Sequence, residues 1–304
     1  MNDEFPGIER DTATRRALGT AETILSRANI HRQYSFPPLD FPAWALARKR
    51  WRGDERVLDV GCGAGAYLRA LRECAPGGAL VAGDHSLCLL GDMAARSEGH
   101  GAALPSLLVM DELALPFPDR TFDVALAAHT LGYAPDIHQA LDEIHRVLRP
   151  EGVLLAVTHS RGHMAEFDVL FRQAYALLGV ADPGGLDGRP DQAFRLENGA
   201  ALLSRHFAAV ARYDIPSMLV FPDAAPVIDY LQCLRPVYAA SLPGWVTWDL
   251  LMQAMEIVLR QVISYLGALV VNKRSGVFVA TDAGDFAAPL MTIGGKALSA
   301  APRV

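Results

Sequence analysis

The acid Asp59 and the glycines that follow it are the first residues of this chain that could bind a ligand. Asp59 ends an apolar run typical of a buried strand and lies two residues before Gly61, the first of three glycines on alternate positions. A carboxylate buried there needs a partner, such as an ammonium group or a set of N–H donors. Glycines allow a sharp turn and close approach of a ligand. A phosphate would be repelled by Asp59, so the turn favours a cationic, phosphate-free ligand; the alternative is that Asp59 caps a local turn.

Asp84 is the second candidate. It follows the apolar segment 79–83 and lies 19 residues after Gly65. An acid at this place in an α/β fold can accept hydrogen bonds from both hydroxyls of a ribose. It could instead cap the next helix, a role that Ser86 could also fill. The spacing Gly61-x-Gly63-x-x-Ala66 also satisfies the relaxed dinucleotide fingerprint, so an NAD-dependent enzyme stays an alternative.

The elements that must position these residues alternate between strand and helix. We expect strands at 56–61, 79–83, 106–110, 122–128 and 152–158, and helices at 64–74, 86–96 and 136–148. Strict alternation of this kind predicts a parallel sheet with helices on both faces.

After residue 158 the alternation loosens. We expect helices at 164–179 and 197–205, a strand at 207–214, a mostly helical block at 223–267, and a strand at 276–280 that closes the sheet edge. The chain then divides into an N-terminal helical arm or lid (1–52), a sheet core (53–214), a helical cap (215–275), a closing strand of the core (276–281) and a tail (282–304). The tail is rich in Ala, Gly and Pro, and we expect it to be poorly ordered.

Composition excludes several classes of function. The net charge of -6 and the lack of long basic runs argue against nucleic-acid binding. No apolar run is long enough to cross a membrane, and the acidic start is not typical of a signal peptide. The four cysteines form no C-x-x-C pair, and no histidines and carboxylates have helix spacing for a metal. We therefore expect a cytoplasmic protein without a metal.

The ordered motifs between 56 and 158 resemble the class I S-adenosylmethionine-dependent methyltransferases, in their UbiE-like small-molecule branch. The motifs are Val57-Leu58-Asp59-Val60-Gly61-Cys62-Gly63-Ala64-Gly65, Gly83-Asp84-His85-Ser86, Leu115-Pro116-Phe117-Pro118-Asp119, Phe122-Asp123-Val124 and the segment from Glu143 to Gly152. The resemblance implies a Rossmann-like, doubly wound sheet of seven strands, mostly parallel with the last strand antiparallel, and a helical cap. The family's usual Pro-Gly-Gly before the fifth strand is Pro150-Glu151-Gly152 here.

The same resemblance implies S-adenosylmethionine as cofactor, lying across the carboxyl ends of the first four strands. Asp59 would face its amino-acid end, Asp84 its ribose and Asp111 its adenine amino group. The implied cofactor contacts are Tyr34, Asp59, Gly61, Cys62, Gly63, Gly65, Asp84, His85, Met110, Asp111, Glu112 and His129. The turn at 115–119 is expected to be mainly structural and to position Asp111.

His129 is the candidate general base, because it stands where the fourth strand ends, above the expected methyl position. It could instead only pack beside the cofactor, and Tyr133 is a weaker candidate for the same role. His31, His159, His163 and Trp245 are predicted to line the acceptor pocket, although loop histidines are also common on surfaces.

The apolar segment 215–271 contains tryptophans, tyrosines and methionines that could line a pocket for an apolar or aromatic acceptor; helical core and a homodimer face are the alternatives. We therefore predict methyl transfer to oxygen or nitrogen of a small organic molecule, of secondary or specialised metabolism, with no nucleic acid and no membrane as partner. Two other functions stay open: an NAD(P)-dependent oxidoreductase and a non-catalytic cofactor-binding protein of the same fold.

Overall fold

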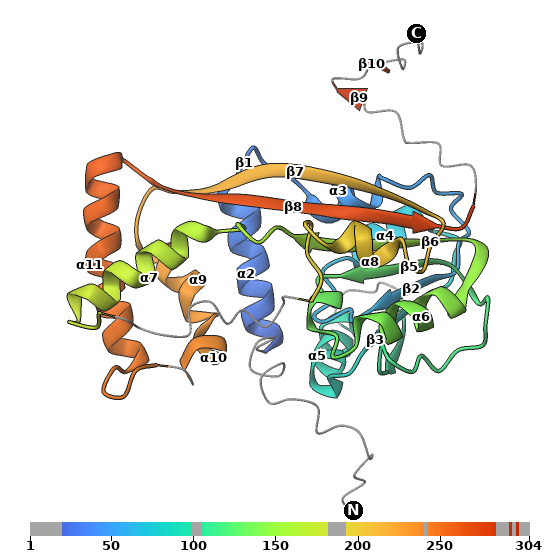
Figure 1. Ribbon diagram of the computed structural model, residues 1–304, viewed down its shortest axis with the longest axis horizontal. Helices are drawn as coiled ribbons and strands as arrows, with labels where there is room; N and C mark the ends of the chain where they lie inside the picture. Colours follow the sequence, from blue (N-terminus) through green and yellow to red (C-terminus); the bar gives the residue numbers. More distant parts are fainter. Residues whose placement is uncertain are drawn as a thin grey trace, which may run out of the picture.

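The computed structural model describes residues 20–98, 105–181, 193–239 and 242–283, and two short strands at 292–293 and 296–297. A mixed sheet of eight strands, in the order β1-β7-β8-β6-β5-β2-β3-β4, forms its centre (Figure 1). Five strands are parallel: β2 (Val57–Val60), β3 (Leu80–Asp84), β4 (Ser106–Val109), β5 (Phe122–Ala128) and β6 (Leu148–His159). These are the five strands expected from the sequence, and the predicted α/β class is confirmed.

The last strand does not close the sheet edge, so that expectation was wrong. Strand β8 (Leu269–Thr281) is antiparallel to β6 on one side and to β7 (Ala209–Phe221) on the other. It lies inside the sheet because β7 pairs with it over its whole length. The edge strand on this side of the sheet is the short β1 (Ser35–Phe36), which is antiparallel to β7 and adds an eighth strand to the seven expected; β4 forms the other edge.

Helices cover both faces of the core because successive strand residues point to opposite sides. Val57 packs with α3 (Phe41–Leu46) and α4 (Leu68–Cys74), whereas Leu58 packs with α6 (Ile137–Val147) and α8 (Gly199–Leu203). Helix α5 (Leu87–Glu98) contacts β3 and β4. Asp136 caps the start of α6: its carboxylate accepts hydrogen bonds from N–H groups of the first turn.

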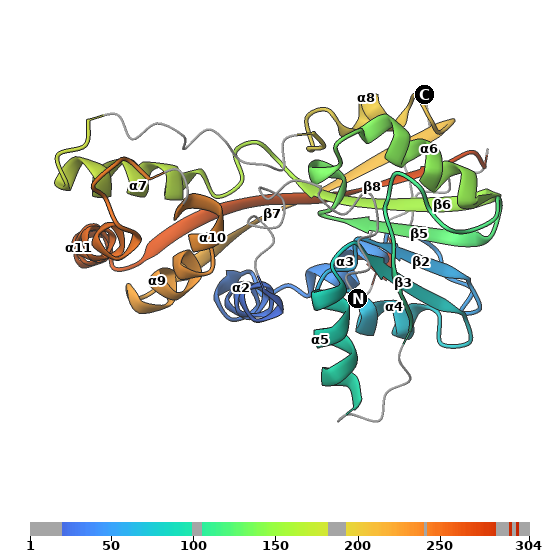
Figure 2. The ribbon, with the colours of Figure 1, turned by 90° about the horizontal axis from the view of Figure 1, so that it is seen from below.

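Strands β7 and β8 are longer than expected and carry the cap. The chain between them forms α9 (Ala225–Gln232), α10 (Arg235–Tyr238) and α11 (Trp248–Leu266). These helices and α7 (Ala165–Leu177) gather at the ends of the two strands that project from the core (Figures 1 and 2). The predicted boundaries at 214 and 275 therefore fall inside strands.

Helix α2 (Ala21–Tyr34) lies between the core and the cap in both ribbon views (Figures 1 and 2). Its Ile30 is buried in the apolar cluster of the cap, together with Leu219 of β7 and Val271 of β8. The N-terminal residues 1–19 lie outside the described residues, as does the predicted tail apart from residues 282–283, β9 (Thr292–Ile293) and β10 (Lys296–Ala297). Within the described ranges, no helix is long and apolar enough to cross a membrane.

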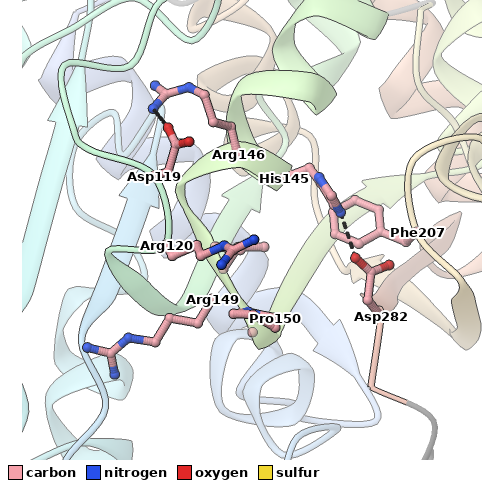
Figure 3. Close-up of a pocket in the computed structure, with 10 residues that line it drawn as sticks. Asp119, Arg120, His145, Arg146, Arg149, Pro150, Phe207 and Asp282 are labelled. Atoms are coloured by element: carbon pink, nitrogen blue, oxygen red, sulfur yellow. Dashed lines mark hydrogen bonds and ion pairs between the residues drawn. The ribbon is translucent and has the colours of Figure 1, made fainter.

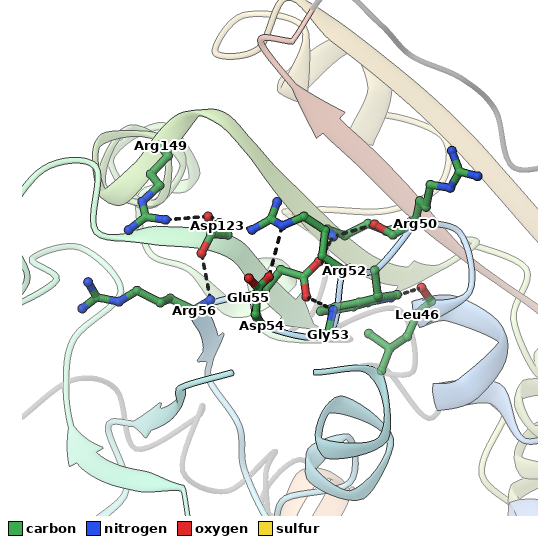
Figure 4. A network of polar contacts seen from close by, with 11 residues as sticks. Leu46, Arg50, Arg52, Gly53, Asp54, Glu55, Arg56, Asp123 and Arg149 are labelled. Atoms are coloured by element: carbon green, nitrogen blue, oxygen red, sulfur yellow. Dashed lines mark hydrogen bonds and ion pairs between the residues drawn. The ribbon is translucent and has the colours of Figure 1, made fainter. Parts of the chain in front are cut away.

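A buried acid, Glu55, anchors the start of β2 (Figure 4). The glycine turn follows the opposite end of the same strand. The Glu55 side chain is fully buried and accepts hydrogen bonds from Lys49 Nζ (2.8 Å) and from the N–H groups of Arg52 (2.7 Å) and Gly53 (2.9 Å). Burial alone would raise the pKa of Glu55, but these bonds outweigh it and lower the pKa to about 2. Glu55 is therefore ionised and structural.

Candidate active site

The glycine turn at the end of β2 needs its glycines for two reasons. Gly61, Gly63 and Gly65 have φ values of 68°, 54° and 83°, which lie in the left-handed region that other residues rarely adopt. A Cβ on Gly61 would also lie 2.2 Å from Thr130 Oγ1. Around the Cβ position of Gly63, by contrast, there is no atom of the described residues within 4 Å. The turn is therefore packed on one side and open at Gly63.

Strand β3 holds the turn in place. The N–H groups of Gly61 and Cys62 both donate to the carbonyl oxygen of Gly83, at 2.8 and 3.0 Å. Burial, and then the negative charges of Asp59 and Asp84, raise the pKa of the Cys62 thiol. Cys62 is thus a neutral packing residue of the turn and is poorly suited to act as a nucleophile.

Asp59 is a buried acid, and one of its carboxylate oxygens accepts no hydrogen bond from the described residues. Its side chain is 1% exposed, and among the described residues its Oδ1 has no hydrogen-bond partner. Burial, and then the charge of Asp84, raise its pKa to about 7. Leaving a buried polar atom unpaired costs about 1–3 kcal/mol, so natural proteins seldom do so without a reason. A cationic group bound at the turn would supply the missing partner.

Asp84 connects the turn with the end of β3. Its buried carboxylate accepts hydrogen bonds from Gly63 N–H (2.8 Å) and Ser86 N–H (2.9 Å), and His85 Nδ1 lies 3.6 Å away. Helix α5 is capped by Ser86 instead, whose Oγ accepts a hydrogen bond from Leu89 N–H (3.3 Å). Each carboxylate oxygen of Asp84 can accept more than one hydrogen bond, so its two bonds leave acceptor capacity for a ligand.

The third predicted acid lies at the same edge of the sheet. Met110 N–H donates to the carbonyl of Asp84 (3.1 Å), and a Cβ on Gly83 would lie 2.4 Å from the Met110 sulfur. The next residue, Asp111, turns the chain by accepting a hydrogen bond from Leu113 N–H (2.9 Å). Glu112 is half-buried beside it. The structure therefore brings the regions of Asp59, Asp84 and Asp111 together at the carboxyl ends of neighbouring strands.

Two side chains that hold the turn at 115–119, Glu143 and Arg146, were not predicted from the sequence. Glu143 accepts a hydrogen bond from Leu115 N–H (2.7 Å) and is paired with Arg146 (2.8 Å). Arg146 also donates to the carbonyls of Phe117 (2.8 Å) and Leu115 (3.0 Å). The signal was the Glu and Arg three residues apart on a predicted helix, which places both on one face.

His129 begins a row of three histidine rings at the ends of β5 and β6. It has a left-handed backbone (φ 58°), and its N–H donates to the carbonyl of Val157 (2.9 Å). The ring centroids of His129 and His159 lie 5.8 Å apart, and those of His159 and His163 lie 4.7 Å apart. Tyr133 is half-buried in a short 3-10 helix just after His129. The structure thus gathers three of the predicted histidines.

The remaining predicted site residues lie toward the cap, and His31 is near enough to the histidine row to contribute to lowering the pKa of His163. The His31 ring contacts the Tyr230 ring (5.6 Å between centroids), and the Tyr34 ring packs against Phe221 (5.0 Å), at the cap. Trp245 is 62% exposed in the loop before α11. Their roles stay predictions. Across the parts of the chain that the structure describes, no group of three or more His, Cys, Asp or Glu side chains is arranged to hold a metal.

A cavity of about 370 Å³ lies apart from this site (Figure 3). It contains none of the predicted site residues. Several of its polar side chains are already paired: Arg146 with Asp119 (2.9 Å) and His145 with Asp282 (2.7 Å). We therefore place the candidate site at the glycine turn and the histidine row.

Known proteins share the core of this chain. The family model of a methyltransferase domain matches residues 58–156. Demethylmenaquinone methyltransferase of Thermus thermophilus is 32% identical over 121 residues, which are 40% of this chain and 54% of the relative. Malonyl-[acyl-carrier protein] O-methyltransferase of Pseudescherichia vulneris is 34% identical over 121 residues, or 40% of this chain and 45% of the relative. The chain thus spans about half the length of these curated relatives.

The fold extends further than the sequence similarity. An N-methyltransferase of Haemonchus contortus, solved with phosphomonomethylethanolamine and S-adenosylhomocysteine, aligns with 89% of this chain and 59% of its own, at a TM-score of 0.54 and 16% identity. At this identity the likeness concerns the fold alone.

Proposed function

We propose, from the premise that residues 58–156 form a class I S-adenosylmethionine-dependent methyltransferase domain, that this chain transfers a methyl group to a small organic acceptor. The observation that carries the proposal is Asp59: a buried carboxylate with an unpartnered oxygen among the described residues, beside an open glycine turn, suits the ammonium group of the methionyl part. A pyrophosphate would place like charge against this acid, which disfavours the NAD(P) alternative.

The residues present fit the cofactor. Asp84 would accept hydrogen bonds from the ribose hydroxyls, and Asp111, with Met110 and Glu112 beside it, would face the adenine. Gly63 leaves the space that a ligand close to the backbone requires. When bound, the cofactor supplies a methyl group already activated on a sulfonium. The protein must then hold the acceptor in line with that methyl group and exclude water.

His129 would serve as the base. An acceptor hydroxyl must lose its proton as the new bond to carbon forms, and His129 would take it at a ring nitrogen. The His129 side chain is exposed at the end of β5, so an acceptor can reach it. A neutral amine would need no base before attack. We propose oxygen or nitrogen as the methylated atom; the names of the relatives include an O-methyltransferase and C-methyltransferases.

Methyl transfer from labelled S-adenosylmethionine to a library of small hydroxylated and amino compounds tests this function. We expect label in at least one small acceptor. Binding of S-adenosylhomocysteine without transfer to any acceptor would favour the non-catalytic alternative.

A further inference from the structure

Lys273 is a charged residue in an apolar part of the molecule. In β8, Leu269 and Val271 are buried in the cap cluster, and Lys273 is the next residue on the same face because side chains alternate along a strand. The neighbours Asn272 and Arg274 on the other face are exposed. A solvated surface lysine would be expected on the exposed face of β8, where Asn272 and Arg274 lie. The inward position of Lys273 therefore requires an explanation.

Two side chains of the α2 region hold this ammonium group. Lys273 Nζ donates to Ser35 Oγ (2.6 Å) and lies 3.4 Å from His31 Nδ1. The Ser35 hydroxyl in turn donates to the carbonyl of His31. His31 Nε2 lies 3.5 Å from the hydroxyl of Tyr230, in the wall of the cap. Both partners of Lys273 are neutral groups, because burial, and then the charges of Lys273 and Arg27, lower the pKa of His31 to about 3.

No carboxylate among the described residues forms an ion pair with Lys273. Burial lowers its pKa to about 8, and no acid opposes this effect. A partly buried ammonium without a counter-ion is costly, and proteins usually pair such charges. Lys273 therefore lacks the anion that its surroundings would favour.

The histidine row, made of His129, His159 and His163, connects the surroundings of Lys273 with the proposed methyl-transfer site. His163 Nδ1 accepts a hydrogen bond from the N–H of Arg274 (3.3 Å), directly beside Lys273. Burial, and then the positive charges of the neighbouring basic groups, hold the pKa of His163 well below 6.5, so its ring is neutral. From His163 the rings of His159 and His129 lead back to the end of β5.

We propose that Lys273, held by Ser35 and His31, binds the anionic group of the acceptor, and that the acceptor is an organic anion with an apolar body. The apolar body would lie against Tyr34, which directly precedes Ser35, is half-buried and packs against the cap cluster. This inference rests on the proposed function, and it adds the class of acceptor.

Binding of small carboxylates to the full chain tests the proposal, with and without saturating S-adenosylhomocysteine. The probes are cinnamate, benzoate and octanoate, each measured by calorimetry beside its neutral amide. We expect at least one acid to bind roughly tenfold to a hundredfold more tightly than its amide, because a charge-assisted hydrogen bond contributes more than a neutral one. Lys273→Met should abolish this preference and leave the affinity for S-adenosylhomocysteine unchanged.

The matched control is Arg274→Met, which removes a positive charge from the next residue on the opposite face and should keep the preference. If Lys273→Met does not fold, Lys273→Gln removes the charge and keeps a polar group, and it should also lose the preference. Equal affinity for acids and amides, or a preference that survives loss of the Lys273 charge, would overturn the proposal. Failure of S-adenosylhomocysteine to bind would instead contradict the proposed function, and the carboxylate measurements without it would still test Lys273.

Discussion

Replacing Asp59 by asparagine should make the ligand-free protein more stable at pH 8. The folded protein holds the proton of Asp59 up to a pKa of about 7, against an ordinary value of 3.8, so folding becomes less favourable as the pH rises from about 4 to 7. A difference of about 3 pKa units, at 1.36 kcal/mol each, corresponds to roughly 4 kcal/mol above pH 7. An asparagine side chain at this position carries no charge, so Asp59→Asn should recover much of this amount.

Urea unfolding at pH 4.5 and pH 8 measures the effect. The gain in unfolding free energy should be present at pH 8 and small at pH 4.5, where Asp59 is protonated in the folded protein. Asp123→Asn is the matched control: Asp123 accepts hydrogen bonds from Arg56 N–H (2.8 Å) and Arg149 (2.7 Å), so its loss should destabilise the protein. An Asp59→Asn variant less stable than the wild type at pH 8 would show that the carboxylate already has a partner, and the argument for a cationic ligand would fail.

Three further predictions concern single residues. Asp84→Ala should weaken S-adenosylhomocysteine binding by about 1–3 kcal/mol in calorimetry, through lost charge-assisted hydrogen bonds; unchanged affinity would remove Asp84 from the site. His129→Ala should lower kcat with little change in cofactor Kd, and a full-rate variant would exclude His129 as the base. Glu55→Gln should lower the unfolding free energy by about 3 kcal/mol at pH 7, because Lys49 loses its buried partner. The Glu55 contribution is present above pH 4.5 and is lost as the pH falls toward 2, so the wild type and Glu55→Gln should differ least in acid.

The core could be predicted because its signals are local. The apolar run of β2, the acid Asp59 and the alternate glycines lie within ten residues, and each residue type there meets a backbone or burial requirement. The parallel order followed from the alternation of strands and helices. The location of the candidate site could then be predicted as well, because the carboxyl ends of neighbouring parallel strands meet at one edge of the sheet.

The long strands β7 and β8 could not be predicted in the same way. Pro216 interrupts the pattern of β7. Gly267 ends helix α11, but residues 269–273 after it do not alternate between apolar and polar types. Their strand conformation comes from pairing with each other, as in Leu219 opposite Val271, which are far apart in the sequence.

Lys273 was missed for a related reason. A single lysine has no spacing motif, and it differs from a surface lysine only because α2 brings His31 and Ser35 against it from more than 230 residues away. The sequence did indicate His31 as a pocket residue. Its charged neighbour became visible only in the tertiary structure.

Calorimetric titration of the purified chain with S-adenosylhomocysteine and, separately, with NADH tests the central claim most directly. We expect one S-adenosylhomocysteine to bind per chain, much more tightly than NADH. Binding of NADH with no detectable binding of S-adenosylhomocysteine would contradict the claim that the glycine turn and its three acids form a methyl-donor site.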